Sequence, residues 1–313
     1  MSNSSLHGIV TSAELCAPLK NVELQRLDSN DEILEITYSD EQGAWQLNSF
    51  GPGERLIFSL NGFTTKKYRY DHVLNLVRLL ENRLIGYLKK LWFIPGELVE
   101  AYIHSPEPFI ARLFRHGYQK KCIKDLDKFD MQIQQVPDSF FVESGLNWKK
   151  TFTFSIPNDA EPGIYSLLLE SADQEPFAIP MVISTHPEKY GQKAKILVLA
   201  STNTWQSYNL WGGRSRYRNF EDNRSVDFLS PFLTYYLKLK GFLSHSLPEW
   251  LRRVIQKIPG KHAKHSEWMF KKLSIRRPFT NCNLEETDPL QPFTNHLAAG
   301  EWRLLAWLER EGY

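Results

Sequence analysis

The sequence is short of cysteine, of long apolar runs and of net charge. Its 313 residues include three cysteines, Cys16, Cys122 and Cys282, whose spacing fits neither a metal site nor a disulfide framework. The formal net charge of +2 gives no general attraction to polyanions, which disfavours nucleic acid as a partner. No run reaches the roughly 20 apolar residues that span a bilayer. The N-terminus also lacks a signal-peptide pattern, so we expect a cytoplasmic protein with reduced thiols and no membrane partner.

Several catalytic motifs are also missing from the sequence. There is no Gly-x-Ser-x-Gly elbow, phosphate-binding loop, dinucleotide fingerprint, His-Glu-x-x-His helix or paired-cysteine motif. Serine hydrolases, nucleotide-dependent enzymes and zinc proteases are therefore poorly supported.

The first two thirds of the chain predict β-structure. Residues 6–70 contain short alternating runs at 8–10, 22–27, 45–47 and 56–60, separated by turns rich in Asp, Asn and Gly. Residues 94–184 contain further strand candidates at 98–103, 110–114, 151–156, 164–169 and 177–183. We expect a small antiparallel sandwich over 6–70 and an immunoglobulin-like sandwich over 94–184.

A helical pattern separates the two predicted sandwiches. Between residues 71 and 93, apolar side chains recur at helical spacing, among them Val73, Val77, Leu80, Leu84 and Leu88. This spacing predicts an amphipathic helix over 71–93 that links the two sandwiches.

The pattern changes again over residues 193–313. The apolar run 195–200 predicts a buried strand of an α/β sheet. A second strand is expected at 273–275, helical material at 228–243, and a terminal helix over about 295–310, with Gly312 in the left-handed position after it. One or two strands cannot complete a doubly wound sheet, so the sequence predicts only the first part of an α/β domain.

An aromatic loop follows the 195–200 run directly. Residues 204–215 read Thr-Trp-Gln-Ser-Tyr-Asn-Leu-Trp-Gly-Gly-Arg-Ser. Open α/β sheets bind ligands beyond the carboxyl ends of their strands, and paired glycines allow a close backbone approach. We therefore expect a site here, with Trp205, Gln206 and Asn209 as catalytic candidates; an aromatic plug over the sheet edge is the alternative.

The order of these parts resembles two known families. Residues 8–63, with Pro18-Leu19, Asp40-x-x-Gly43-x-Trp45 and Asn61-Gly62-Phe63, resemble the carboxypeptidase regulatory-like, transthyretin-like domain. Residues 94–313 resemble the large (beta) subunit of N,N-dimethylformamidase. The resembling segments are 204–209, Trp211-Gly212-Gly213-x-Ser215-x-Tyr217, Arg277-Pro278-Phe279, and Trp302 with 307–313.

The second resemblance implies a catalytic domain similar to class-I glutamine amidotransferases and hydrolysis of amide C–N bonds. It also implies an iron ion held by two tyrosines and a glutamate, ligands that suit Fe(III). Tyr208 matches the first tyrosine. Phe279 stands where we place the second, and no match for the glutamate occurs in this sequence. The resemblance thus predicts an N-terminal portion, or an incomplete form, of an enzyme for small amide substrates. The resemblance also implies a homo-oligomer or a complex with a small-subunit partner.

A non-catalytic binding protein is the rival hypothesis. Segment 252–277 carries nine basic residues and one acidic residue, with Trp250, Trp268 and Phe270 in or beside it. Such a mixture could bind an anionic glycan or a protein, although a solvated basic face is the simpler interpretation. His262 and His265 could share a helical face as metal ligands, but the surrounding lysines favour a solvated helix.

Overall fold

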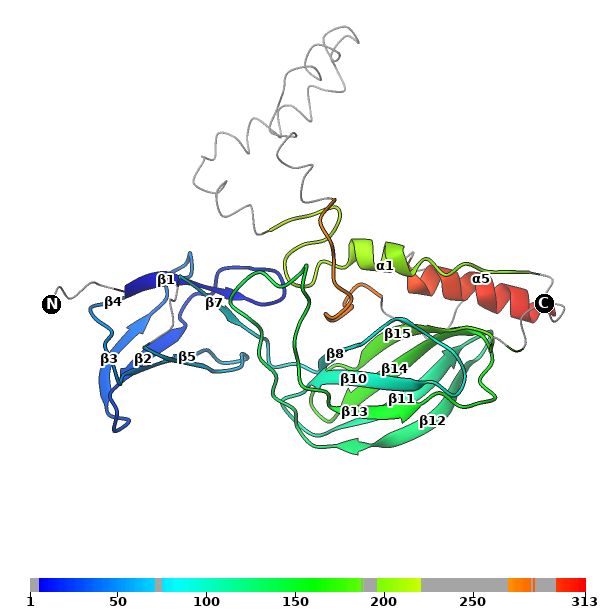
Figure 1. Ribbon diagram of the computed structural model, residues 1–313, viewed down its shortest axis with the longest axis horizontal. Helices are drawn as coiled ribbons and strands as arrows, with labels where there is room; N and C mark the ends of the chain where they lie inside the picture. The colour runs from blue at the N-terminus through cyan, green and yellow to red at the C-terminus, as the bar shows by residue number, and fades with distance from the viewer. Residues whose placement is uncertain are drawn as a thin grey trace, which may run out of the picture.

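The computed structural model describes residues 6–70, 75–186, 188, 196–220, 270–282, 284 and 297–313. Figure 1 shows a small β-sandwich beside a larger one, with helices α1 and α5 lying along the larger sandwich. The described part of the chain is therefore mostly β-sheet, as the sequence predicts. None of its helices is long and apolar enough to cross a membrane.

The first sandwich pairs a three-stranded sheet, in the order β4-β1-β7, with a four-stranded sheet, in the order β3-β2-β5-β6. Trp45, Leu24 and Phe58 fill the space between the sheets, and the rings of Trp45 and Phe58 meet edge to face at 5.3 Å. Its strands are β1 (Leu6–Ser12), β2 (Glu23–Leu27), β3 (Ile33–Tyr38), β4 (Ala44–Leu47), β5 (Arg55–Ser59), β6 (Lys66–Arg69) and β7 (Leu76–Leu79).

The second sandwich pairs sheet β13-β10-β8 with the five-stranded sheet β12-β11-β14-β15-β9. All five strands that the sequence predicts between residues 98 and 183 are present. Its strands are β8 (Ile85–Leu88), β9 (Trp92–Phe93), β10 (Leu98–His104), β11 (Phe109–His116), β12 (Lys120–Phe129), β13 (Phe152–Ser155), β14 (Gly163–Ser171) and β15 (Phe177–Ile183).

The predicted linking helix over 71–93 is wrong, because this segment contributes strands to both sandwiches. β7 belongs to the first sandwich, and β8 and β9 belong to the second. The side chains face three different cores: Val77 packs in the first sandwich, Tyr87 at the joint and Leu88 in the second sandwich. Strands buried on both faces do not alternate, so their apolar residues mimic helical spacing.

The predicted buried strand at 195–200 is also wrong over its described residues. Residues 196–200 form no strand, and Leu197 and Leu199 are 95% and 89% exposed. No strand in the described part of the chain pairs with this run, so its apolar side chains have no sheet to join. Residues 273–275 are not a strand either. The expected helix at 228–243 lies outside the described residues.

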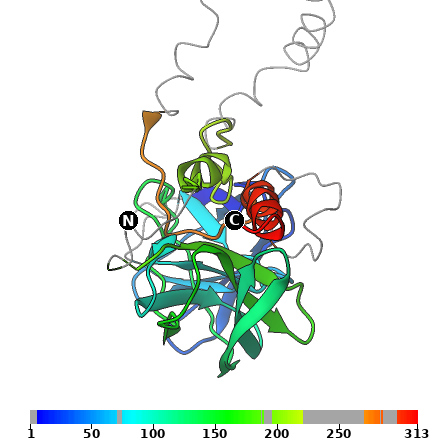
Figure 2. The ribbon, with the colours of Figure 1, turned by 90° about the vertical axis from the view of Figure 1, so that its right-hand side faces the viewer.

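The terminal helix α5 (Ala298–Arg310) confirms the prediction and covers the outer face of the five-stranded sheet. Trp302 is buried there, and its Nε1 donates to the backbone carbonyl of Gly117 at 2.7 Å. Gly312 follows the helix with φ +83°. Figure 2 shows α5 and the segment around α1 (Thr202–Tyr208) on the same side of the second sandwich.

Asp138 ties the two sandwiches together from a loop of the second sandwich. Its carboxylate accepts hydrogen bonds from Lys66 Nζ at 2.6 Å, from Tyr68 OH at 2.7 Å and from the backbone N–H of Arg78 at 2.9 Å. Burial lowers the pKa of Lys66, while the adjacent carboxylate opposes that shift. Because a lost partner would leave a buried charge, this joint resists separation of the sandwiches.

Candidate functional site

All four candidate residues from the aromatic loop lie on α1 or directly after it. Trp205 is fully buried between α1 and α5, where its Nε1 donates to the Glu301 carboxylate at 3.2 Å. The side chain of Asn281 donates in turn to the Trp205 carbonyl at 2.9 Å. Trp205 therefore anchors α1 on α5.

Gln206 and Asn209 both bind backbone groups of the segment 270–284. The Gln206 amide donates to the carbonyl of Leu273. Asn209 is fully buried, donates to the carbonyl of Pro278 at 2.9 Å, and accepts from the backbone N–H of Trp211 at 3.2 Å. These contacts occupy the polar atoms of Asn209 and give it a positioning role in the described structure. The catalytic roles that the sequence predicts for Gln206 and Asn209 stay predictions.

The side chain of Arg277 binds backbone carbonyls of the aromatic loop. Its guanidinium is fully buried and donates to the carbonyls of Trp211 at 2.6 Å, Arg214 at 2.9 Å and Ser274 at 3.1 Å. Burial, helped by the nearby charge of Arg214, lowers the pKa of Arg277 to about 9. The arginine remains charged at neutral pH, and removal of its side chain would leave three buried carbonyls without this donor.

The paired glycines provide the close approach that the sequence predicts, but the approach is to protein. Gly212 and Gly213 have φ of +91° and +87°. A Cβ on Gly212 would lie 2.7 Å from Val142, and one on Gly213 would lie 2.4 Å from the sulfur of Cys16. The loop thus packs against both sandwiches at once, through Cys16 of the first and Val142 of the second.

Tyr208 and Tyr217 are aromatic residues of this segment that are exposed to solvent, unlike Trp205 and Trp211. They are 38% and 56% exposed, and their rings pack at a centroid distance of 4.4 Å. A backbone hydrogen bond from Arg216 N to Ser207 O, 2.8 Å long, holds the two halves of the loop side by side. The buried residues therefore form a scaffold that presents two phenols.

The two phenols interact through their hydroxyl groups. A side-chain hydrogen bond with Tyr217 raises the pKa of Tyr208, and the charge that Tyr217 would carry raises it further. Because both effects raise a pKa that ordinarily lies near 10, Tyr208 is protonated at neutral pH. A protonated phenol is a hydrogen-bond donor as well as an acceptor.

The described residues do not make a complete iron site. Phe279, at the place of the expected second tyrosine, is 2% exposed and packs in the core between α1 and α5. Tyr217 could replace it as a phenol donor. However, no carboxylate contributes to the pKa shift of Tyr208, and the described part of the chain contains no cluster of metal-binding His, Cys, Asp or Glu.

Sequence reasoning missed the pairing of Tyr208 with Tyr217. The signal was the Gly-Gly turn between them, which folds the chain back so that positions 207 and 216 are opposed. His262, His265 and most of the basic segment 252–277 lie outside the described residues.

Comparison with known proteins yields distant structural likenesses. The chain is 14% identical to E. coli alpha-2-macroglobulin in its native conformation, with a TM-score of 0.20 over 58% of this chain and 12% of that one. Salmonella alpha-2-macroglobulin reacted with methylamine gives 13% identity, a TM-score of 0.21 and the same coverage. A DUF3823 family protein from Parabacteroides merdae gives 15% identity and a TM-score of 0.19 over 58% of this chain and 98% of that one.

The chain thus spans 12% of the length of the alpha-2-macroglobulins, and TM-scores near 0.2 support no argument about function. No curated protein matches the sequence. One family model does match, that of the N,N-dimethylformamidase beta subunit-like C-terminal region, and it covers residues 110–313. This match includes most of the second sandwich, the aromatic loop and α5. The chain therefore belongs to the N,N-dimethylformamidase beta subunit-like family.

Proposed function

We propose that this protein acts on the C–N bond of small amides and that Tyr208 and Tyr217 bind the amide carbonyl. Membership of the N,N-dimethylformamidase beta subunit-like family supports the amide as the substrate class. The observation that carries the site is the division of the aromatic loop. Trp205, Asn209 and Trp211 are fully buried, whereas the two tyrosines are exposed and in contact.

The chemistry of this pair suits an amide carbonyl. Hydrolysis of an amide places negative charge on the carbonyl oxygen, and hydrogen-bond donors fixed in advance stabilise that charge. A hydrogen bond joins the two hydroxyl groups, and protonated phenols can donate to a carbonyl oxygen. The raised pKa of Tyr208 keeps its phenol protonated at neutral pH.

The scaffold beneath the pair fixes its position. Asn209 directly follows Tyr208, and the carbonyls of Trp211 and Arg214 are both held by the buried Arg277. Residues that hold a site without touching substrate are positioning residues, and we assign this role to Asn209 and Arg277.

For residues 193–313, the proposal also includes a fold similar to class-I glutamine amidotransferases and an iron ion with Tyr208 among its ligands. Fe(III) prefers phenolate oxygens, which are hard anionic donors, and a bound metal ion lowers the pKa of a phenol. In the iron-loaded protein Tyr208 would therefore be deprotonated and would hold the ion, whereas without iron it is a protonated donor. Small amides would be the substrate whether or not the protein binds iron. Among the described residues, nothing favours the rival glycan-binding or protein-binding role of the basic segment 252–277.

Hydrolysis of N,N-dimethylformamide tests the proposal. We expect the protein, supplied with Fe(III), to release dimethylamine, and Tyr208→Phe to lower kcat/KM by about tenfold to a hundredfold through loss of a carbonyl donor. Tyr118→Phe is the matched control, because Tyr118 is 42% exposed but lies away from the loop, beside α5. It should retain the wild-type rate.

Two results would contradict the proposal. One is a Tyr208→Phe variant as active as Tyr118→Phe. The other is a wild-type protein that releases no dimethylamine with Fe(III) and shows no binding of N,N-dimethylformamide.

A further inference from the structure

The first sandwich has an open edge at β3. Strand β3 pairs with β2 on one side, and no strand in the described part of the chain pairs with its other side. Its apolar residues point outward: Ile33, Leu34, Ile36 and Tyr38 are 54%, 47%, 47% and 56% exposed. Natural edge strands are usually protected by Lys, Pro, inward-pointing charges or bulges. β3 contains no Lys or Pro, and its protection consists of the inward-pointing Glu35 and a register shift in its pairing with β2.

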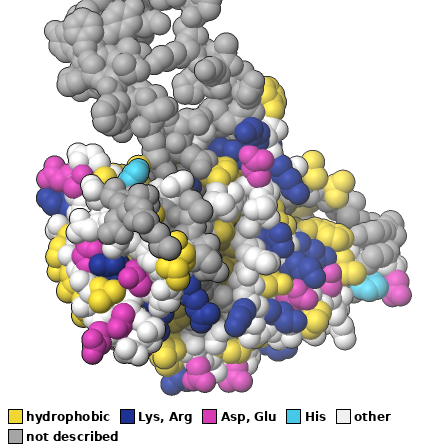
Figure 3. Space-filling view, turned by 60° about the vertical axis from the view of Figure 1, so that its left-hand side comes forward, with side chains coloured by type: hydrophobic (Ala, Val, Ile, Leu, Met, Phe, Trp, Pro, Cys, Tyr) yellow, Lys and Arg dark blue, Asp and Glu magenta, His cyan; other side chains and the backbone are white. Residues whose placement is uncertain are grey.

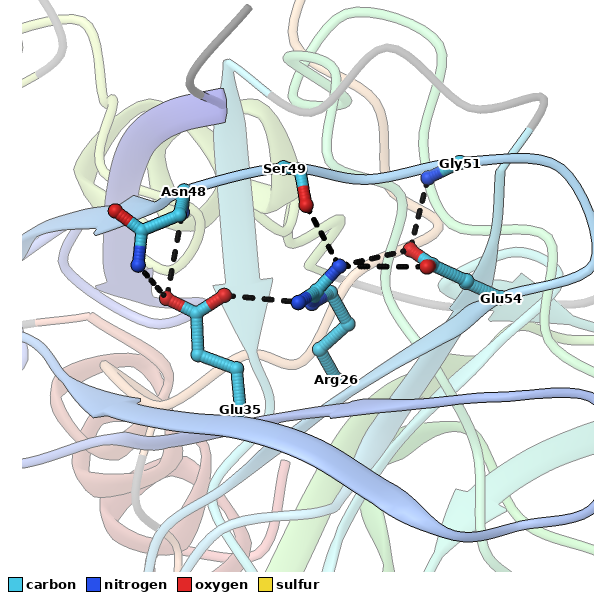
Figure 4. Close-up of polar contacts among 6 residues, drawn as sticks. All are labelled: Arg26, Glu35, Asn48, Ser49, Gly51 and Glu54. Carbon is cyan, nitrogen blue, oxygen red and sulfur yellow. Dashed lines mark hydrogen bonds and ion pairs between the residues drawn. The ribbon is translucent and has the colours of Figure 1, made fainter. Parts of the chain in front are cut away.

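A partly buried polar network connects this edge strand to its neighbours. Arg26 of β2 forms ion pairs of 3.3 Å with Glu35 of β3 and with Glu54 before β5. Asn48 donates to the other oxygen of Glu35, and Ser49 accepts from Arg26 (Figure 4). Because both sheets share the network, β3 cannot move without breaking these bonds. It is therefore ordered before any partner binds, which lowers the entropic cost of pairing.

The charge around β3 is one-sided. Segment 28–41, which contains β3, has six acidic residues and no Lys or Arg. Basic residues elsewhere neutralise Asp31, Glu35 and Glu41. The remaining carboxylates, Asp28, Glu32 and Asp40, have no basic partner among the residues that the structure describes. Figure 3 shows acidic, basic and hydrophobic side chains interspersed on the visible face of the molecule.

An open groove lies at the C-terminal end of the same strand. It has a volume of about 650 Å³ and lies between β3, β1 and β4. Ile9 and Tyr38 give it apolar walls, and Asp40 places a carboxylate at its lining. Apolar walls beside a carboxylate suit a Lys or Arg side chain, whose stem is apolar and whose end is charged.

We propose that β3 is a docking edge for an extended basic segment of another protein, in which Lys or Arg alternates with branched apolar residues. Such a segment adds a strand to the sheet through backbone hydrogen bonds. Its apolar side chains cover Leu34, Ile36 and Tyr38, and its basic side chains face the surplus carboxylates. A second copy of this chain does not fit, because twofold pairing of β3 would oppose two equally acidic edges.

Peptide binding to this protein tests the proposal. The probe is a fluorescent nine-residue peptide that alternates Lys with Val, and its twin carries Glu in place of Lys. We expect the basic peptide to bind, to bind more weakly as salt is added, and the acidic twin not to bind. A version of the basic peptide with one central Val replaced by Pro should also fail, because Pro removes a ladder hydrogen bond.

Matched variants then locate the site. Ile36→Lys should weaken binding of the basic peptide at least about fivefold, through lost apolar contact and added like charge. Leu98→Lys is the control, since Leu98 is 55% exposed on β10 of the second sandwich. Equal thermal unfolding of the two variants would show that both are folded.

Three outcomes overturn the proposal: equal binding of both peptides, binding unaffected by Ile36→Lys, or binding reduced equally by Leu98→Lys. Self-association of the wild type that disappears in Ile36→Lys would identify a second copy as the occupant. That result also contradicts the proposal.

Discussion

At the scale of single residues, the aromatic loop owes its shape to groups that touch no solvent. Arg277 and Asn209 bind backbone carbonyls, and Gly212 and Gly213 allow contact with both sandwiches. The unusual composition of the loop identifies it from the sequence alone. The sequence does not show which loop residues are buried and which phenols are exposed, because burial depends on α5 and on Val142, which are distant in sequence.

Gly213 gives a prediction at this scale. Gly213→Ala should lower the free energy of unfolding by about 2 kcal/mol more than Gly53→Ala, as measured by urea denaturation. Both glycines have positive φ, +87° and +84°, so both substitutions carry the same backbone strain. Only Gly213 has a neighbour within reach of the added Cβ, the sulfur of Cys16.

The double variant Gly213→Ala with Cys16→Ala checks the cause. It should lose less stability than the two single variants added together, because the second change removes the atom that the first one meets. Equal losses for Gly213→Ala and Gly53→Ala would mean that the contact with Cys16 is unimportant.

At the scale of elements, sequence periodicity predicted strands well where one face is buried and the other solvated. β1, β2, β4, β5 and β10 follow this pattern, and β14 and β15 were recognised instead by their continuous apolar runs. Periodicity failed for β7 and β8, whose side chains face several cores, and it missed the edge strands β3 and β12, of which β12 is rich in charged residues. Tertiary contacts determined the structure of those segments, and such contacts cannot be predicted from the local sequence.

The exposed run 196–200 gives a prediction for an element. The double variant Leu197→Ser and Leu199→Ser should change the free energy of unfolding by no more than about 0.5 kcal/mol, since both side chains are almost fully exposed. It should also lower self-association, measured by light scattering, because an exposed apolar run promotes association. A large loss of stability would show instead that these leucines are buried in solution.

At the scale of the whole molecule, α5 covers the second sandwich over a buried histidine whose protonation makes stability depend on pH. His116 of β11 is 1% exposed, accepts or donates at Ser166 Oγ over 2.8 Å, and packs edge-on against Trp302 of α5. Burial lowers the pKa of His116 to about 3, with a smaller contribution from Lys120. Its imidazole is therefore neutral in the folded protein.

The sign of the pH effect follows from that depressed pKa. Below its ordinary value of 6.5, the unfolded state binds a proton that the folded state does not, so stability falls as the pH falls from 6.5 towards 3. Between pH 7.5 and pH 5, His116→Gln should lose about 2 kcal/mol less stability than the wild type in urea denaturation. His7→Gln, at an exposed position on β1, should behave as the wild type does. Identical pH profiles for all three proteins would contradict this assignment.

The whole-molecule architecture was only partly predictable. Two sandwiches and a terminal helix follow from local patterns, but the joint between the sandwiches does not. Asp138 binds Lys66, Tyr68 and Arg78, which lie sixty residues or more away in the sequence, and no local spacing predicts such contacts.

The most direct test of the central claim is NMR of tyrosine labelled with ¹³C at Cζ, during titration with N,N-dimethylformamide. The signals can be assigned with Tyr208→Phe, Tyr217→Phe and Tyr118→Phe. We predict that the Tyr208 and Tyr217 signals shift together and saturate, while Tyr118 stays in place. If neither Tyr208 nor Tyr217 moves, or if Tyr118 moves as much as they do, the exposed tyrosine pair is not the amide-binding site.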